Sequence, residues 1–129
     1  MDILYADIIN KLINLYQGRS RGCCLSILNH HGDDIFYIKL GNPTHCSIAL
    51  CKKKAFTAYT FNNNPDEIYT VLSAMGSQPL IDKDYCFIPG GIVAENQQGK
   101  KIYIGISTDV AAIDKELAMA IANVFTEEK

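Results

Sequence analysis

The sequence lacks long apolar runs and any excess of basic residues. No segment approaches the roughly eighteen consecutive apolar residues of a membrane span, and the N-terminus opens with Asp2 instead of a basic region leading into an apolar stretch. We therefore expect neither a transmembrane segment nor a secretory signal, and we predict a cytoplasmic protein. The formal net charge of −2 and the pI near 5.8 predict no nucleic-acid or membrane partner, because both are held mainly by Lys and Arg. The only basic run is Lys52-Lys53-Lys54.

Motifs for nucleotide, metal or disulfide chemistry are also missing. There is no phosphate-binding P-loop or dinucleotide fingerprint, and the 5 cysteines contain no C-x-x-C pair. An odd number of cysteines without that spacing fits reduced thiols, most of them small buried side chains. Cys46, near a predicted helix start, is a possible nucleophile, but no spaced Cys, His and Asn or Asp signature accompanies it. The acidic residues Asp82, Asp84, Asp109 and Asp114 cannot be placed opposite one another from the sequence.

What is present fits a single compact domain. The 129 residues are 48% hydrophobic and 20% charged, which suffices for one core and is too little for two. No linker or low-complexity tract divides the chain, so we predict one domain over residues 1–129.

Apolar periodicity and turn residues predict the order of the elements. The expected helices span residues 2–17 and 44–61, followed by a shorter helix from Pro65 and a last helix capped by Thr108-Asp109. The expected strands form two hairpins, one from residues 23–28 and 35–40, the other from residues 85–88, 92–95 and 101–107. This order predicts an α+β fold in which an antiparallel sheet of two hairpins packs against helices in α-β-α layers.

For two of these helices, the pattern predicts which side chains are buried and which are exposed. On the long helix, Lys54 lies at the border of the stripe expected to be buried. On the last helix, Asp114, Lys115 and Glu116 are expected to face water.

Short glycine, alanine and lysine signatures resemble a known family. They are Gly41-Asn42-Pro43-Thr44, the segment from Ser47 to Ala58, Pro89-Gly90-Gly91-Ile92, Gly105-Ile106-Ser107 and Asp114-Lys115-Glu116-Leu117-Ala118. Together they resemble the GlcG/HbpS family, to which the C-terminal domain of PduO-type corrinoid adenosyltransferases belongs. The resemblance implies a profilin-like sheet between helices, assembly into homo-oligomers and, in several members, binding of haem or a related tetrapyrrole. It also implies a link to glycolate, diol or glycerol metabolism and a possible metabolic enzyme complex.

The resemblance and the residue types together nominate five site residues. Gly90 and Gly91 can admit a ligand close to the backbone or offer N–H groups to an anion, although a bulge is the commoner role of glycine in a sheet. Lys54 can pair with a ligand carboxylate, or it can be an ordinary surface lysine. Ser107 is included because it lies in a matching segment. His45, in the first helical turn, is a candidate ligand for haem iron, or simply a residue at a helix start.

Three functional hypotheses remain open at this point. The first is a non-enzymatic module that binds haem or a corrinoid for carriage, sensing or protection, with its pocket between Gly90-Gly91 and the Lys54 face of the long helix. The second is an oligomeric structural or regulatory subunit, favoured by the absence of a histidine from the first helix. The third is a small enzyme acting on a hydroxy or oxo acid.

His30 and His31 lie in a predicted turn and are expected to be solvated, because a metal site there would need further ligands. Tyr85, Tyr103 and Phe87 are expected to pack between sheet and helix.

Overall fold

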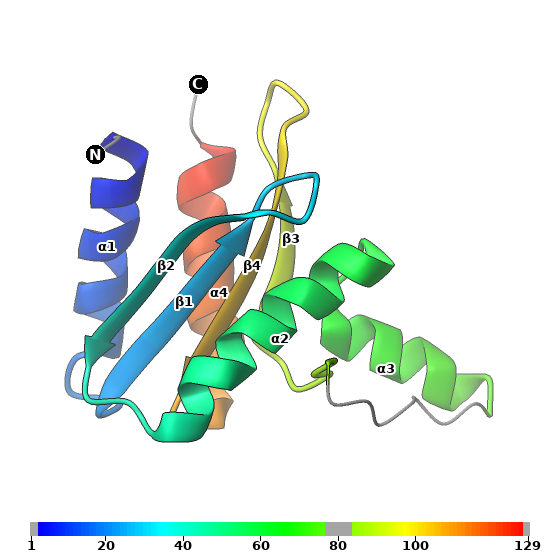
Figure 1. Cartoon of the computed structure of the whole chain (residues 1–129), viewed down its shortest axis with the longest axis horizontal. Coiled ribbons are helices and arrows are strands. Elements are labelled where there is room, and N and C mark those ends of the chain that lie inside the picture. Colours follow the sequence, from blue (N-terminus) through cyan, green and yellow to red (C-terminus); the bar gives the residue numbers. More distant parts are fainter. Residues whose placement is uncertain (1–2, 77–83, 128–129) are drawn as a thin grey trace.

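The computed structural model describes residues 3–76 and 84–127, which form four helices and four strands (Figure 1). In chain order these are α1 (Ile3–Tyr16), β1 (Gly22–Leu28), β2 (Asp34–Gly41), α2 (His45–Phe61), α3 (Pro65–Ala74), β3 (Gly91–Glu95), β4 (Lys101–Thr108) and α4 (Ala111–Thr126). The α+β prediction is confirmed. None of the helices in these two ranges is both long and apolar enough to cross a membrane.

The sheet has the strand order β2-β1-β4-β3 with antiparallel pairing throughout. Both predicted hairpins form, β1 with β2 and β3 with β4. The two hairpins are joined by pairing of β1 with β4, in which Leu25 lies opposite Ile106. The centre of the sheet is therefore made by strands far apart in the sequence.

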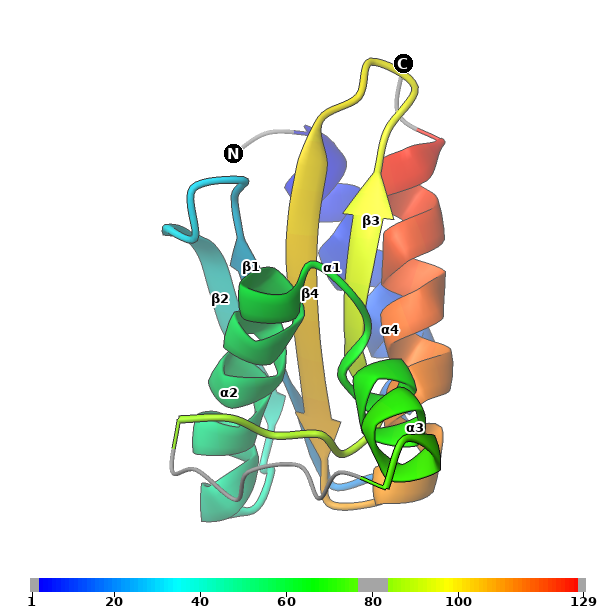
Figure 2. The ribbon, with the colours of Figure 1, turned by 90° about the vertical axis from the view of Figure 1, so that its right-hand side faces the viewer.

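Helices cover both faces of the sheet (Figure 2). Alternation along β4 directs Ile102, Ile104 and Ile106 into the cluster formed with α1 and α4, and Tyr103 into a smaller cluster with α2. Gly105 lies on the α2 side, where a Cβ atom would collide with the carbonyl oxygen of Cys51. The helix can approach the strand closely only because this side chain is absent.

The larger core lies between the sheet and the pair α1 and α4. Its fully buried members come from all of these elements: Ile8, Leu12, Cys23, Leu25, Ile104, Ile106, Leu117, Ala118 and Ile121. Four of the five cysteines are buried, as predicted, and Cys46 is exposed.

Helix α2 ends and α3 begins through a short asparagine-rich connection. Asn62 adopts a left-handed conformation with φ 50°, and Pro65 occupies the first turn of α3, as the sequence predicts. Asn64 Oδ1 accepts a hydrogen bond of 2.9 Å from the backbone N–H of Val93. The connection is thereby fixed to the edge strand β3.

Two sequence-based expectations are wrong. Residues 85–88 do not form a strand, because β3 begins at Gly91 and the backbone N–H of Cys86 instead donates to Thr57 Oγ1 of α2 at 2.9 Å. Asp114 does not face water, since it is 1% exposed. In both cases tertiary contacts override the local pattern.

The expected ends of two helices also shift slightly. Helix α4 starts at Ala111 after Val110, and the Thr108 hydroxyl accepts a hydrogen bond from the Val110 N–H at 3.0 Å. The first helix is observed from Ile3 to Tyr16. Its predicted start at Asp2 lies outside the described residues, as does Asp82.

Candidate functional site

Lys54 forms a buried ion pair with Asp114. The Lys54 ammonium donates to Asp114 Oδ2 at 2.9 Å and to the carbonyl oxygen of Ile106 at 2.9 Å. Both charged side chains are 1% exposed. Burial of a charge is unfavourable unless its hydrogen-bonding groups have partners, so this arrangement depends on all of these contacts.

The second oxygen of Asp114 is also satisfied. Asp114 Oδ1 accepts a hydrogen bond from the Thr108 hydroxyl at 2.7 Å and another from the Thr108 N–H at 3.1 Å. The carboxylate thus joins α2, the end of β4 and the first turn of α4. The contacts make this pair a connection between the two helical layers.

Gly90 packs directly against this ion pair, and Gly91 packs against Pro65 and the backbone of Lys54. A Cβ atom on Gly90, which has φ 130°, would lie 2.5 Å from the carbonyl oxygen of Ile106 and 2.9 Å from Lys54 Nζ. A Cβ atom on Gly91 would lie 2.7 Å from the ring of Pro65. The double glycine therefore provides space for the lysine ammonium and for the start of α3.

The five predicted site residues do not all meet. Lys54, Gly90 and Gly91 come together, and Ser107 is buried on β4 opposite Cys24. His45 is exposed in the first turn of α2, nine residues before Lys54, or about 13 Å along the helix axis. Direct contact of these residues with a ligand stays a prediction.

The segment leading into Gly90 borders an open pocket of about 420 Å³. Helix α3 provides one wall and the chain before β3 provides the other. The residues that line it are Asp66, Tyr69, Thr70, Phe87, Ile88 and Pro89. We refer to these six residues as the α3 pocket.

Aromatic rings surround the α3 pocket. Phe87 has its ring centroid 6.5 Å from that of Tyr69, 5.8 Å from that of Phe61 and 6.5 Å from that of Tyr85. Tyr69 and Ile88 remain 49% and 46% exposed. Large apolar side chains that stay in contact with solvent around a hollow are typical of a binding surface.

Asp66 supplies the charge of the α3 pocket. Its Oδ2 accepts a hydrogen bond of 2.6 Å from the Lys115 ammonium, and this contact raises the pKa of Lys115 above its ordinary value of 10.5. Asp66 Oδ1 is buried and has no hydrogen-bond partner among the described residues. A buried acceptor without a partner is unfavourable, so a donor supplied by a ligand or water would be stabilised there.

Sequence reasoning missed the α3 pocket. It assigned Tyr85 and Phe87 to packing between sheet and helix, but the Phe87 ring lies beside Tyr69 of α3, and the Tyr85 ring lies beside Phe61 of α2. The expectation is confirmed for Tyr103, which packs edge-on against Tyr59 of α2 at 5.3 Å. The alternation of Tyr85 and Phe87 before Ile88-Pro89 was the available signal, and it was attributed to a strand.

The described residues contain no cluster of three or more His, Cys, Asp or Glu side chains able to hold a metal ion. The rings of His30 and His31 are tilted against each other with their centroids 3.9 Å apart, and both residues are exposed.

Solved structures of low sequence identity share this fold. Klebsiella pneumoniae protein ORFY superposes with a TM-score of 0.82 at 14% identity, covering 98% of this chain and 90% of that one. A complex of PduOC with heme gives 0.80 at 18% identity, with coverages of 96% and 93%. A double mutant of Streptomyces reticuli HbpS gives 0.76 at 18% identity, with coverages of 95% and 84%.

The family assignment comes from the sequence itself. No curated protein matches the chain. The family model HbpS-like, described as haem degrading protein HbpS-like, matches residues 4–123. Because this match spans nearly the whole chain, as the glycine, alanine and lysine signatures predicted, the protein belongs to the HbpS-like family.

Proposed function

We propose that this protein is a non-catalytic binding module for a tetrapyrrole, either haem or a related corrinoid, and that the macrocycle binds at the α3 pocket. The observation that carries the proposal is the apolar hollow lined by two neighbouring aromatic rings, the exposed Tyr69 and the half-buried Phe87. The family description and the similar structure of PduOC with heme support this ligand class. Carriage, sensing or protection of the cofactor would then be the biological role, in the cytoplasm and in a pathway of diol, glycerol or glycolate metabolism.

The side chains of the α3 pocket fit the chemistry of a substituted macrocycle. Phe87 and Ile88 offer apolar surface to its flat face, and aromatic rings favour stacked or edge-on contact with such a ring system. Beside the pocket, Lys115, which pairs with Asp66 and is 42% exposed, offers an ammonium group to acidic substituents. When bound, the metal of the macrocycle would supply the capacity to bind small ligands or change oxidation state.

Tyr69 is the new candidate for contact with the metal. Its side chain lines the α3 pocket and carries a phenol oxygen, and tyrosine is an established axial ligand of haem iron. His45, nominated by the sequence, lies on α2 and is not among the residues that line this pocket. Replacement of the residue that binds the metal should change the absorption band, whereas replacement of the other residue should not.

Lys54, Gly90 and Gly91 would then support binding without touching the ligand. The Lys54 ammonium already donates to two acceptors, and Gly90 follows directly after the pocket residue Pro89. We propose that the buried ion pair fixes the backbone on which Phe87, Ile88 and Pro89 are carried. For Ser107, a ligand contact remains a prediction from the resemblance alone.

Absorption titrations with hemin and with cobalamin test the proposal. The variants are Phe87→Ala for the pocket wall, Tyr69→Phe and His45→Ala for the metal, and Met119→Ala as a matched control, because Met119 is 50% exposed on α4. We expect the wild type to give a saturable, shifted absorption band. Phe87→Ala should lower the affinity at least about tenfold, because it removes roughly one buried aromatic contact. A changed band with Tyr69→Phe and an unchanged one with His45→Ala assigns the metal ligand to Tyr69.

Other outcomes point elsewhere. Equal weakening by Phe87→Ala and Met119→Ala, or no saturable band with either ligand, would overturn binding at the α3 pocket. Bleaching of the bound hemin band under a reductant and oxygen would indicate an enzyme of the kind that the family description names.

The second candidate is an oligomeric subunit without a tetrapyrrole. It is favoured by the same exposed apolar side chains, which include Phe61, Tyr69, Met75 and Ile88. Sedimentation of the wild type and of Ile88→Glu tests it. A homo-oligomer that dissociates in the variant, combined with the absence of ligand uptake, favours this candidate over the first.

A further inference from the structure

Two buried cysteines meet where α2 crosses the sheet (Figure 1). The members of β1 that belong to the core on the α1 and α4 side are Cys23, Leu25 and Ile27. Because side chains alternate along a strand, Cys24 and Ser26 face α2 instead. Cys51 of α2 lies over the same region, since a Cβ atom on Gly105, which is opposite Ser26, would collide with its carbonyl oxygen. Both cysteines are 0% exposed.

The thiol of Cys24 has the surroundings of a reactive thiol. Its pKa is lowered from the ordinary 9.0 to about 7 by a hydrogen bond from the Cys51 thiol, against the opposing effect of burial. A hydrogen bond from the Tyr37 hydroxyl and the charge of Lys39, the cross-strand neighbour of Cys24, act in the same direction as Cys51. The contact with Cys24 and burial raise the pKa of Cys51. One sulfur therefore ionises first, beside a second that keeps its proton.

The Cys51 thiol has an acceptor in either state of its neighbour. Its Sγ lies 3.3 Å from the carbonyl oxygen of Ile48, to which the S–H can donate while Cys24 is protonated. When Cys24 ionises, the same S–H can turn to the thiolate. This pair of adjacent sulfurs is the arrangement needed for thiol oxidation to a disulfide.

Tyr37 lies at the boundary between Cys24 and solvent. It belongs to the edge strand β2, it is 38% exposed, and its hydroxyl reaches the Cys24 thiol. The Lys52 ammonium lies 4.8 Å from the centroid of its ring. Rotation of this one side chain at the edge of the sheet would open a path from solvent to Cys24.

An unpartnered hydroxyl lies beside the two thiols. Ser26 Oγ is buried and has no hydrogen-bond partner among the residues that the structure describes. Ser26 is opposite Tyr37 of β2 and Gly105 of β4, two residues from Cys24 on the same face of the sheet. A small molecule with polar oxygens would be stabilised there by the hydrogen bond that Ser26 lacks.

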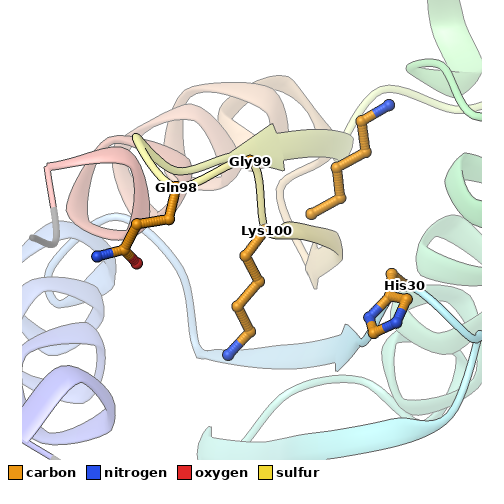
Figure 3. A pocket seen from close by; sticks show the side chains of 5 residues that line it. His30, Gln98, Gly99 and Lys100 are labelled. Atoms are coloured by element: carbon orange, nitrogen blue, oxygen red, sulfur yellow. The ribbon is translucent and has the colours of Figure 1, made fainter.

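The charged hollow at the end of the sheet where the two hairpins turn has no such convergence. It measures about 330 Å³ and is lined by His30, Gln98, Gly99, Lys100 and Lys101. Figure 3 shows that His30 and Lys100 come from different turns and extend in different directions. Its polar groups are therefore spread around an open surface, whereas the two thiols contact each other.

We propose that Cys24 and Cys51 form a dithiol that hydrogen peroxide oxidises to a disulfide, with Cys24 as the attacking sulfur and Cys51 as the second sulfur. The bond would join α2 to the central strand β1. Hydrogen peroxide is small, and its oxygens can hydrogen-bond to Ser26. This inference uses none of the residues of the α3 pocket and stands independently of tetrapyrrole binding.

The oxidation proceeds in two balanced steps. The Cys24 thiolate attacks one peroxide oxygen, the O–O bond breaks, and the leaving hydroxide is protonated to water, which leaves a sulfenic acid on Cys24. The Cys51 sulfur then bonds to the Cys24 sulfur, the S–O bond breaks, and a second water departs with the Cys51 proton. The two thiols are thereby oxidised by two electrons, and the peroxide is reduced to two molecules of water.

Mass spectrometry of the native protein treated with hydrogen peroxide tests the proposal. The wild type should lose two hydrogen atoms, and peptide mapping without reduction should recover Cys24 joined to Cys51. Cys46→Ser is the matched control, because it removes the exposed cysteine of α2, and it should form the same bond. Cys51→Ser should stop at a sulfenic acid on Cys24, which dimedone traps.

The pH dependence of the reaction provides a second readout, which does not require replacement of a buried cysteine. The rate in the wild type should rise with pH through about 7 and then level off, because the thiolate is the attacking group. Tyr37→Phe removes the hydroxyl that stabilises this thiolate. The midpoint of the pH profile should therefore move upward, and the rate at pH 7 should fall about threefold or more.

Three results would overturn the proposal. The first is that the disulfide forms only after the protein is unfolded in urea. The second is peptide mapping that joins Cys24 or Cys51 to another cysteine instead of to each other. The third is a pH profile with the same midpoint in the wild type and in Tyr37→Phe.

Discussion

Three consecutive residues of α4 make ion pairs that differ in burial. Asp114 pairs with Lys54 at 2.9 Å with both side chains 1% exposed, whereas Lys115 pairs with Asp66 at 2.6 Å with exposures of 42% and 19%. Glu116 pairs with Arg19 at 2.7 Å, and both are well exposed. Since the distances are similar, burial and the number of additional hydrogen bonds decide how much each pair matters.

The difference in burial distinguishes an ion pair that holds the fold together from one that borders a candidate binding pocket. The Asp114 carboxylate has a partner for each oxygen and joins α2 to α4 and β4. The Asp66 carboxylate uses one oxygen for Lys115, and its other oxygen is buried without a partner among residues 3–76 and 84–127. A fully hydrogen-bonded buried pair stabilises the fold, whereas the pair of Lys115 with Asp66 borders an open pocket and leaves the ammonium partly exposed.

The largest effect is expected at the buried pair. Lys54→Met should lower the free energy of unfolding by about 3–5 kcal/mol, because it leaves the Asp114 carboxylate buried without its cation. The double variant Lys54→Met with Asp114→Leu should recover much of that loss, since no charge then remains buried. Urea denaturation measures the free energy of unfolding of both variants. If the value for Lys54→Met lies within 1 kcal/mol of wild type, which is about fivefold in the folding equilibrium, the structural role of the pair is refuted.

The next effect is expected at Gly90. Gly90→Ala should cost about 1–3 kcal/mol beyond the backbone penalty, because the added methyl group meets the Ile106 carbonyl and the Lys54 ammonium. Gly18→Ala is the matched control, because Gly18 also has a positive φ but would have no atom within 4 Å of an added Cβ. Equal stability losses in the two variants would show that only backbone conformation matters at Gly90.

A smaller effect is expected at the pair of Lys115 with Asp66. Lys115→Gln should lower stability by about 1 kcal/mol or less, because the lysine is partly exposed and screened by solvent. The hydrogen bond to Asp66 raises the pKa of Lys115, so its contribution is fully present below the ordinary value of 10.5 and is lost as the pH rises through the folded value. Thermal melts of wild type and variant should therefore converge at alkaline pH, and a constant difference would contradict this assignment.

The smallest effect is expected for Arg19 and Glu116. The hydrogen bond from Arg19 lowers the pKa of Glu116, so any stabilisation is present at neutral pH and is lost as the pH falls through the depressed value. Arg19→Gln should change the melting temperature slightly at low salt and not at high salt, because both groups are exposed. A large change in melting temperature that persists at high salt would show that this exposed pair stabilises the fold as the buried pair of Lys54 and Asp114 does.

Much of the fold was predictable because its signals are local. The helix around Pro65, the hairpins at Asn29 and Asn96, and the burial of four cysteines follow from turn residues and from apolar periodicity. The signatures around Lys54, Gly90 and Gly91 also indicated the correct family and brought three of the five nominated residues together. Their immediate neighbours, however, are the protein's own Ile106, Asp114 and Pro65.

The sequence by itself determined which segments become helices and strands and which family the chain belongs to, because these depend on residue type and spacing along the chain. Only the tertiary structure decided that Asp114 turns inward to meet Lys54, 60 residues earlier. It also decided that Phe87 lies beside Tyr69 of α3 and that Tyr85 packs against Phe61 of α2. The physical reason is that burial, charge pairing and cavities arise between elements distant in sequence, and no local pattern specifies which faces will meet.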